Sequence, residues 1–341
     1  MNINNTLKIY ASKNFTPIKI NSLKNVLNSP RIPILHQSKF LKEELSIRLS
    51  HRVFDLLKLP YGLPILSPIK NVIDLYCDSF DRIQNINVSK KSDIDDFCDL
   101  LSDIKDKHSN LEDNISNGLL QLNREFEPNL INYTLINKEL DKFFLSRISI
   151  RTLISQNIEL VKNNSSIIKN CRLDEIINDS VNEVNYICEN NYSRYPSIQI
   201  INKDKEIVFP YIPSHIYYIL NEILKNSCVA QIKNNNFCDS ITIDYCEGKN
   251  DIIIQIIDNG ISFPVKDIDN ILTYSYSSNP IEDNYNSQNK PIMCGFGFGL
   301  PMARLYSKYF GGNLIITPME NKGTIISIYI NKLGNNPEAF I

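Results

Sequence analysis

Several patterns that mark large protein classes are missing from this sequence. No run of 18 or more apolar residues occurs among the 341 residues, so no membrane-spanning helix is expected. The eight cysteines include no Cys-x-x-Cys pair, which argues against a zinc site and against a disulfide framework. The formal net charge is only −2, so the chain has no global basic field for nucleic acid. With 43% apolar residues, the chain can instead supply a core to each of two folded domains.

Acidic residues are absent from the first 42 positions, where lysine and a single arginine stand among serine, threonine and asparagine. An acid-free, basic and hydroxyl-containing N-terminus is typical of a mitochondrial presequence, although arginine is scarce here. The alternative is a disordered arm in a chain rich in asparagine and lysine. We therefore expect residues 1–30 to be a presequence or a disordered arm, with the presequence favoured.

Glycine is scarce between residues 39 and 188, where apolar residues recur every three or four positions. One such stripe runs from Leu41 through Leu49 to Leu56. This period is typical of amphipathic helices, and no strand pattern interrupts it. We therefore expect a helical bundle of the four-helix type over residues 31–192.

The pattern changes after Tyr195, where short runs rich in β-branched residues alternate with helical stretches at 213–233 and 300–310. A mainly antiparallel sheet with helices on one face accounts for this order. We therefore expect an α+β fold, in which an α/β sandwich of residues 193–335 follows the bundle and residues 336–341 form a tail. The expected strands are 197–201, 240–246, 251–257, 314–317 and 324–330.

Three short motifs in the second half carry side chains suited to chemistry. In the first, Asn-Glu-Ile-Leu-Lys-Asn at 221–226, Glu222 and Asn226 are four residues apart and share one helix face. The carboxylate suits proton abstraction and the carboxamide suits metal coordination. By itself the pair is weak evidence, because these residue types at this spacing usually form a solvated face.

The second motif, Asp258-Asn259-Gly260, follows a predicted strand. A carboxylate at a strand end can accept the exocyclic amine of adenine, and a glycine permits close backbone approach. An ordinary Asp-Asn-Gly turn would have the same sequence, and such turns are common.

The third motif has glycines at alternate positions, Gly295, Gly297 and Gly299, directly before a predicted helix. Alternating glycines leave backbone N–H groups free to bind phosphates at a helix N-terminus, where the helix dipole also favours negative charge. A glycine pattern of this kind is weak evidence alone. Its place before a helix and after the other two motifs strengthens it.

In order, spacing and context, the three motifs resemble the N, G1 and G2 boxes of the GHKL superfamily, which includes gyrase, Hsp90, histidine kinases and MutL. Residues 295–312 further resemble the G2 region of mitochondrial pyruvate dehydrogenase kinases and branched-chain α-ketoacid dehydrogenase kinases. Residues 42–52, 146–151 and 209–226 resemble other parts of the same kinases. These segments span both expected domains, which the chance match of one glycine loop would not do.

The resemblance implies a role for each matching residue. Glu222 would be the general base that takes the proton of a substrate serine, Lys225 would lie beside it, and Asn226 would hold Mg²⁺. Asp258 would bind the adenine amine with Gly260 at the base of the ring. ATP and Mg²⁺ are the implied cofactors, with K⁺ as a further candidate. The remaining implied nucleotide-site residues are Thr324 near adenine, a lid at 272–294, and its phosphate-binding end Gly295, Phe296, Gly297, Phe298, Gly299 and Leu300.

In the helical half, His108, Arg147 and Arg151 match the family's pocket for an α-ketoacid effector. Two guanidinium groups one turn apart can bind a carboxylate, which fits a ketoacid inhibitor. From the residues alone, His108 would be a surface histidine in a polar run. The two arginines could equally be structural ion-pair residues.

The sequence also departs from the family in the nucleotide-binding half. Ile261 and Ser262 stand where the family has two glycines, and Val229 stands where it usually has an arginine. Tyr218 occupies the position of a histidine found in the pyruvate-type kinases, as in the branched-chain type. These changes leave the fit of the adenine-side turn and the tuning of Glu222 open.

The resemblance implies a homodimeric serine kinase of the mitochondrial matrix, with the E1 and lipoyl-bearing E2 components of an α-ketoacid dehydrogenase complex as partners. Tyr218, the Gly311-Gly312 pair and the ending 338–341 favour branched-chain E1 slightly. The amino-acid sequences of residues 146–151 and 213–215 favour the E1 component of pyruvate dehydrogenase as the substrate. Two alternatives stay open: an ATP-binding scaffold with little or no catalysis, and a histidine kinase with His51 as phosphoacceptor.

Overall fold

The structure, a computed structural model, describes residues 4–25, 34–127, 130–202, 206–234, 239–274, 297–320 and 322–339. The chain divides into two compact units, one up to Ile167 and one from Ile168 to Ala339. This division falls well before the expected boundary at 192. Helix α8 (Leu173–Tyr192) lies in the second unit because it packs against α9 (Pro213–Lys233), and not against the bundle.

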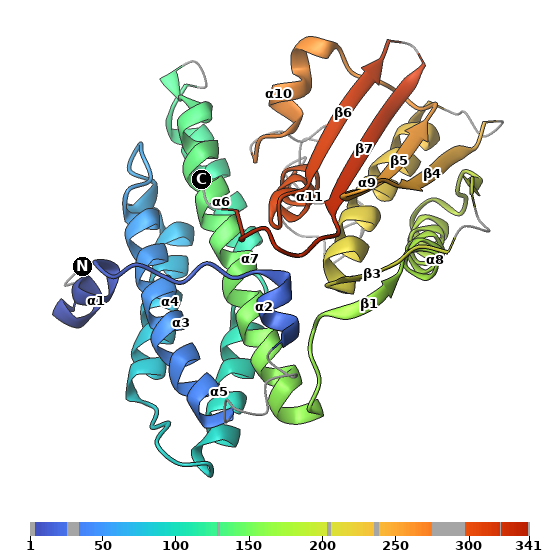
Figure 1. Cartoon of the computed structure of the whole chain (residues 1–341). Helices are drawn as coiled ribbons and strands as arrows, with labels where there is room; N and C mark the ends of the chain where they lie inside the picture. Colours follow the sequence, from blue (N-terminus) through green and yellow to red (C-terminus); the bar gives the residue numbers. More distant parts are fainter. Residues whose placement is uncertain are drawn as a thin grey trace. The chain divides into compact units, whose positions relative to one another are not determined.

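The first unit is the expected helical bundle (Figure 1). Helix α3 packs against α4 and α7, α4 packs against α6, and α5 packs against α7. The predicted stripe on α3 is its core face, since Leu45, Leu49 and Val53 are fully buried. The helices are α1 (Asn5–Ala11), α2 (Ile20–Asn25), α3 (Ile34–Leu57), α4 (Ser67–Asn85), α5 (Asp93–Lys107), α6 (Leu111–Glu125) and α7 (Tyr133–Asn163), with a 3₁₀ turn η1 (Leu63–Ile65).

Residues 4–25 are folded against the bundle, which differs from the disordered alternative for this segment. Leu7, Ile20 and Leu23 are buried. The backbone N–H of Thr16 donates to the Glu44 carboxylate at 2.9 Å, and Arg48 donates to the Thr16 carbonyl at 2.7 Å. The segment therefore gains both apolar and charge-assisted contacts with α3.

The second unit contains a five-stranded sheet of order β2-β4-β5-β7-β6, antiparallel except for β2 and β4. Helix α9 packs on β5, and α11 packs on β6 and β7. Alternate residues of β5 are buried from Ile252 to Asp258, as expected for a sheet covered on one face. The elements are β2 (Ile198–Ile200), β4 (Ile241–Glu247), β5 (Asp251–Asp258), η3 (Val265–Asp267), α10 (Ile268–Ile271), α11 (Gly299–Lys308), β6 (Asn313–Met319) and β7 (Gly323–Asn331).

The structure also contains two strands that the sequence did not predict. β1 (Lys169–Arg172) lies in the region expected to be helical, and it pairs antiparallel with β3 (Val208–Tyr211), which lies in the expected α/β region. The sequence of β1 is Lys-Asn-Cys-Arg, which has little intrinsic strand preference, so its partner strand determines its conformation. No helix in the described ranges is both long and apolar enough to cross a bilayer.

Candidate active site

Helix α9 carries the first group of predicted site residues. Pro213 occupies its first turn, where a missing N–H costs no hydrogen bond. Ile219, Ile223 and Leu224 are buried and anchor one face in the core. The opposite face therefore presents the polar residues, with Glu222 half-buried and Asn226 exposed, as the i, i+4 spacing predicts.

Both carboxylate oxygens of Glu222 have close neighbours. Lys225 Nζ donates to Oε1 at 2.5 Å, and this ion pair is about one-fifth exposed. Oε2 lies against the α carbon of Gly299, so closely that a side chain there would collide with it. Because Gly299 is the first residue of α11, the Glu222 carboxylate lies at the N-terminus of that helix. The structure thus brings a carboxylate close to the N-terminus of a helix, where backbone N–H groups point outward.

Asp258 is the last residue of β5, and its side chain is 3% exposed. Ser227 Oγ–H donates to its Oδ2 at 3.1 Å, and the Gly260 N–H donates to Oδ1 at 3.0 Å. Burial raises the pKa of this carboxyl, and the hydrogen bonds from Gly260, Ser227 and Thr324 act in the opposite direction. The group is a buried, held acceptor suited to an N–H donor such as the adenine amine.

Two glycines allow the backbone around Asp258 to pack closely. A Cβ on Gly260 would lie 2.5 Å from the carbonyl carbon of Ala230 and 2.6 Å from the nitrogen of Gln231, both in α9. Gly323 has φ of +104°, and a Cβ there would collide with the Asp258 carbonyl oxygen. Only glycine fits at these two positions.

Thr324 is a close neighbour of Asp258. It is directly opposite Asp258 in the β5–β7 ladder and is 5% exposed. The sequence reasoning missed Ser227 and Gly323, although each stands next to a predicted residue, Asn226 and Thr324 respectively. That adjacency was the available signal.

The phosphate-binding segment is described only from Gly297 onward. Gly297 has φ of +84°, a conformation that favours glycine, and α11 starts two residues later. The Phe298 side chain is buried and contacts the Tyr274 ring at 5.2 Å, while Leu300 is half-buried. Phe298 therefore anchors the loop through its side chain and leaves its backbone for contacts. Gly295, Phe296 and most of the expected lid, 275–294, lie outside the described residues.

The departures from the family pattern also have definite positions. The Ile261 side chain is about half exposed, and its N–H donates to the Ala230 carbonyl at 3.1 Å. The turn after Asp258 is therefore tied to α9 by a backbone hydrogen bond. Val229 is half-buried on α9 and supplies no charge.

A nucleotide-bound Mg²⁺ would be compatible with these residues. Within the described ranges, no three or more His, Cys, Asp or Glu side chains cluster as a metal site. Mg²⁺ in nucleotide-dependent enzymes commonly takes one or two protein oxygens, and phosphate and water supply the other ligands. The exposed Asn226 amide, one turn beyond Glu222, can supply such an oxygen.

The helical unit holds a second group of predicted residues around His108. This side chain is 3% exposed, not on the surface as its polar surroundings in the sequence indicated. Ser79 Oγ donates to the Leu75 carbonyl and lies 2.8 Å from His108 Nε2. Burial, and then the charges of Arg147 and Arg151, lower the pKa of His108 to about 3. The imidazole is therefore neutral at physiological pH.

The two arginines line the same region through different contacts. Arg147 Nη2 donates to the His108 carbonyl at 3.0 Å, and Nη1 lies 3.3 Å from the Glu112 carboxylate. Arg151 donates to the Lys105 carbonyl at 3.3 Å. The Tyr76 ring lies 4.6 Å from the His108 ring. Among the described residues, the buried Tyr76 hydroxyl and Arg147 Nε have no hydrogen-bond partners, an uncommon state that a polar ligand would relieve.

Two family models match the chain, and the first extends beyond Ile167 into β1 and α8 of the second unit. Residues 17–188 match the model described as mitochondrial branched-chain alpha-ketoacid dehydrogenase kinase. Residues 212–333 match the model of histidine kinase-, DNA gyrase B- and HSP90-like ATPases, which agrees with the positions of Glu222, Asp258 and Gly299.

Curated relatives align with nearly the whole chain. A mitochondrial pyruvate dehydrogenase kinase of Arabidopsis thaliana is 33% identical, over 89% of this chain and 87% of its own. Isozyme 4 of the human pyruvate dehydrogenase kinases is 28% identical over 87% and 76%, and the Ascaris suum enzyme is 29% identical over 86% and 78%. The chain therefore belongs to the mitochondrial α-ketoacid dehydrogenase kinases, a family of protein-serine kinases with a GHKL ATPase domain.

Proposed function

We propose that this kinase transfers the γ-phosphoryl group of Mg-ATP to a serine of the E1 component of a mitochondrial α-ketoacid dehydrogenase complex and so inactivates it. The observation that carries the proposal is that Glu222, a residue of α9, lies at the N-terminus of α11. The same helix α9 also contacts Asp258 through Ser227. Glu222 and Ser227 are five residues apart in α9, about 7.5 Å of helical rise. This spacing along α9 supports the proposal that Glu222 and Asp258 act at different points along one nucleotide.

Each site residue has a role in this proposal. Glu222 accepts the proton of the serine hydroxyl. The serine oxygen forms a bond to the γ-phosphorus, and the bond between the γ-phosphorus and the departing ADP breaks. Lys225 positions Glu222 through their ion pair. Asn226 would hold Mg²⁺, which would supply neutralisation of phosphate charge when bound. Positioning and charge neutralisation suffice for phosphoryl transfer.

The nucleotide is held at its two ends. Asp258, Gly260 and Thr324 bind the adenine side. The phosphates meet the free N–H groups at the start of α11. The phosphate-side residues are Gly295, Phe296, Gly297, Phe298, Gly299 and Leu300, the first two with the lid outside the described residues.

An α-ketoacid effector is proposed to bind in the helical unit beside His108. Arg147 and Arg151 would bind its carboxylate, because both guanidinium groups lie near the end of α5, where they contact the His108 and Lys105 carbonyl groups and both lower the pKa of His108. The unpartnered Tyr76 hydroxyl and Arg147 Nε supply further donors. A neutral His108 can accept or donate one hydrogen bond without adding charge.

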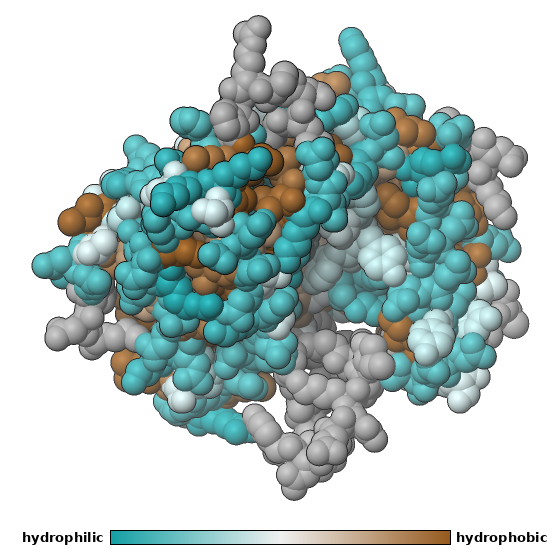
Figure 2. Space-filling view, turned by 90° about the horizontal axis from the view of Figure 1, so that it is seen from below, coloured by the Kyte–Doolittle hydropathy of each residue, from teal (hydrophilic) through white to brown (hydrophobic). Residues whose placement is uncertain are grey.

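The partner proposals draw on surfaces of each unit by itself. Hydrophobic residues reach the surface at several places in Figure 2. In the helical unit, the Phe40 and Ile65 side chains are 51% and 82% exposed. Exposed apolar side chains of this kind suit contact with the lipoyl-bearing E2 component that the resemblance implies. In the second unit, Ile257 is half-buried on the face of the sheet opposite its helices, and Ile315 is 44% exposed. That face suits a second copy of the chain, and the mitochondrial matrix is the proposed location.

Two E1 components are candidates. Tyr218 favours the branched-chain type, and in the structure its ring lies 4.7 Å from that of Tyr306 in α11. The curated relatives named above are pyruvate dehydrogenase kinases, which makes pyruvate dehydrogenase E1 the second candidate. Incubation of the kinase with radiolabelled ATP and each purified E1 tests the choice. We expect more label on branched-chain E1, and label on pyruvate dehydrogenase alone would reverse the assignment.

The two alternative functions make different predictions in the same assay. A scaffold would bind ATP through Asp258 and label neither E1. A histidine kinase would phosphorylate itself on His51, with acid-labile phosphate. The structure disfavours the latter, since His51 Nε2 lies 3.0 Å from the Lys13 carbonyl oxygen, a contact in which the ring nitrogen donates.

A further inference from the structure

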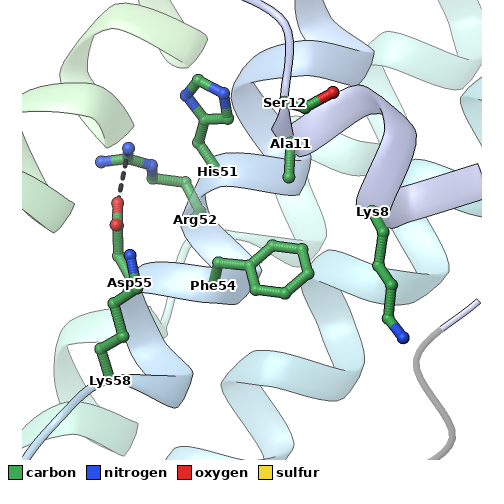
Figure 3. Close-up of a pocket in the computed structure, with 8 residues that line it drawn as sticks. All are labelled: Lys8, Ala11, Ser12, His51, Arg52, Phe54, Asp55 and Lys58. Carbon is green, nitrogen blue, oxygen red and sulfur yellow. Dashed lines mark ion pairs between the residues drawn. The ribbon is translucent and has the colours of Figure 1, made fainter. Parts of the chain in front are cut away.

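A cavity of about 510 Å³ lies in the helical unit between α1 and the C-terminal half of α3 (Figure 3). Its volume is within the range of small-molecule sites, roughly 300–1,000 Å³. None of its lining residues belongs to the His108 pocket or to the nucleotide site. One wall consists of Lys8, Ala11 and Ser12, and the other of His51, Arg52, Phe54, Asp55 and Lys58.

The cavity carries a net positive charge. Its acid, Asp55, is paired with Arg52 at 2.6 Å. Lys8 and Lys58 are exposed, one on each wall, and within the described ranges neither ammonium group forms an ion pair or a side-chain hydrogen bond. Burial lowers the pKa of His51, so its ring adds no charge at neutral pH. Two uncompensated positive charges therefore face the cavity from opposite sides.

Arg52 adds a buried donor to this charge. Its side chain is nine-tenths buried, Nη1 donates to the Lys142 carbonyl at 2.9 Å, and Nη2 pairs with Asp55. Its Nε–H is buried and has no acceptor among the described residues. A buried guanidinium normally has its donors satisfied, so an unpaired one at a cavity indicates a missing polar partner.

The same contacts narrow the chemistry of that partner. Nη1 and Nη2 of Arg52 each already contact one acceptor, so Nε–H is the Arg52 nitrogen that has no acceptor among the described residues. The lysines are flexible point charges, which suit a phosphate group carrying about −1.5 to −2 charge at pH 7. Phe54 and Ala11 provide apolar surface for a carbon skeleton.

We propose that this cavity binds a small phosphate monoester, with the phosphate between Lys8 and Lys58 and the carbon part against Phe54 and Ala11. Because the two lysines come from α1 and α3, the ligand would tie the N-terminal segment to the bundle. Backbone amides of 5–12 should then exchange more slowly with solvent when the ligand is bound. The proposal is independent of the phosphotransfer function.

Calorimetric titration of the full chain with glycerol 3-phosphate tests the proposal. The variant is Lys8→Met with Lys58→Met, which removes both charges and keeps most of each side-chain stem. The matched control is Lys19→Met with Lys39→Met, which removes two exposed lysines of the same unit outside the cavity. Succinate, a dianion without phosphorus, is titrated in parallel, and hydrogen exchange follows residues 5–12.

We expect saturable binding by the unsubstituted chain and by the control, at least tenfold weaker binding by the Lys8 and Lys58 variant, and slower exchange at 5–12 only where binding survives. Binding that persists in the variant would place the ligand elsewhere, including the nucleotide site, and overturn the proposal. Equal loss in the control would show diffuse charge attraction, and equal affinity for succinate would contradict the phosphate assignment. Absence of saturable binding would also refute it.

Discussion

The carboxylate of Glu222 and the α carbon of Gly299 are in direct contact, with no room between them for a side chain. Gly299 thus has two functions in the proposed site. It starts the helix whose N–H groups meet the phosphates, and it leaves space for the base. The third glycine of the motif is therefore required by Glu222 as well as by the nucleotide.

Substitution Gly299→Ala should displace the Glu222 carboxylate. A displacement of about 1 Å in a reacting group can cost about 100-fold in rate, so we expect the transfer rate to fall by roughly that factor. ATP affinity should change far less, because the adenine contacts at Asp258 are untouched. Single-turnover phosphorylation of E1 and separate titration with ATP distinguish the two effects.

Gly248→Ala is the matched control, since Gly248 lies in the loop between β4 and β5 and contacts neither site. It should leave the transfer rate unchanged. A Gly299→Ala protein with full activity would show that the Glu222 carboxylate has no fixed position in catalysis.

Asp258 should lower the stability of the folded protein at pH 7 and increase its affinity for ATP. Because burial raises its pKa in the folded state, the folded protein binds this proton more tightly than the unfolded chain. Proton binding by Asp258 therefore stabilises the folded protein fully below the pKa of this residue in the unfolded chain, near 4. This stabilisation is lost as pH rises through the pKa of Asp258 in the folded protein. Asp258→Asn should therefore unfold at a higher temperature than the unsubstituted chain at pH 7, with a smaller difference near pH 4.

The same substitution should weaken ATP binding by tenfold or more, because a charged acceptor for the adenine amine is lost. Thermal unfolding of both proteins at several pH values, with ATP titration at pH 7, measures both effects. Asp258→Asn with unaltered ATP affinity would remove Asp258 from the adenine site.

Much of this site follows from the sequence, and the rest depends on long-range pairing. The i, i+4 spacing of Glu222 and Asn226 already places them on one face. Gly323 could not be assigned in this way, because its constraint is the carbonyl of Asp258 on the neighbouring strand. His108 appeared polar and exposed by its neighbours, but it lies between α5 and α6, against Tyr76.

The division between the two compact units differs from the predicted boundary at 192 for a similar reason, although the two family matches, 17–188 and 212–333, fall on either side of that boundary. The period of α8 shows that it is amphipathic, but no period shows which core its apolar face joins. Its contacts with α9 decide that, and the pairing of β1 with β3 carries the preceding residues into the same unit.

His215 should make the second unit sensitive to acid. Its ring is buried among Tyr306, Tyr309 and Phe310, and Nδ1 has no hydrogen-bond partner in the part of the chain that the structure describes. Burial lowers the pKa of His215 to about 3. In the unfolded chain, His215 has a pKa of about 6.5. The free energy of unfolding therefore falls as pH drops below 6.5 toward 3, and His215 accounts for a loss of about 2 kcal/mol at pH 5.

Replacement His215→Phe removes the titrating group at similar volume. Urea unfolding at pH 5 and pH 7.5 should show a loss of stability between the two values that is about 2 kcal/mol smaller in the variant. An identical pH dependence in both proteins would mean that His215 is protonated as easily in the folded state as in the unfolded one.

Ketoacid inhibition should depend on Arg151 and be nearly independent of pH. Arg151→Met should raise the inhibitory ketoacid concentration at least tenfold, because a charge-assisted contact is lost. Inhibition should be flat between pH 6.5 and 8, since His108, with a pKa of about 3, stays neutral throughout. Dose–response curves at four pH values provide the measurement.

Arg82→Met is the control for Arg151. Arg82 pairs with Asp103 at 2.6 Å in the same unit. Its substitution therefore removes an equal charge outside the proposed pocket. Inhibition that is lost equally in both variants, or that titrates with a midpoint near 6.5, would contradict the assignment of the pocket.

Transfer of labelled phosphate to E1 by the Glu222→Gln variant tests the central claim most directly. Glutamine keeps the size of the side chain and its place beside Gly299, but it cannot accept the serine proton. If Glu222 is the catalytic base, the unsubstituted kinase should form stable serine phosphate on E1, and Glu222→Gln should transfer phosphate at least 100-fold more slowly. Both proteins should still bind ATP. Undiminished transfer by Glu222→Gln, or label on neither E1 with the unsubstituted kinase, would contradict it.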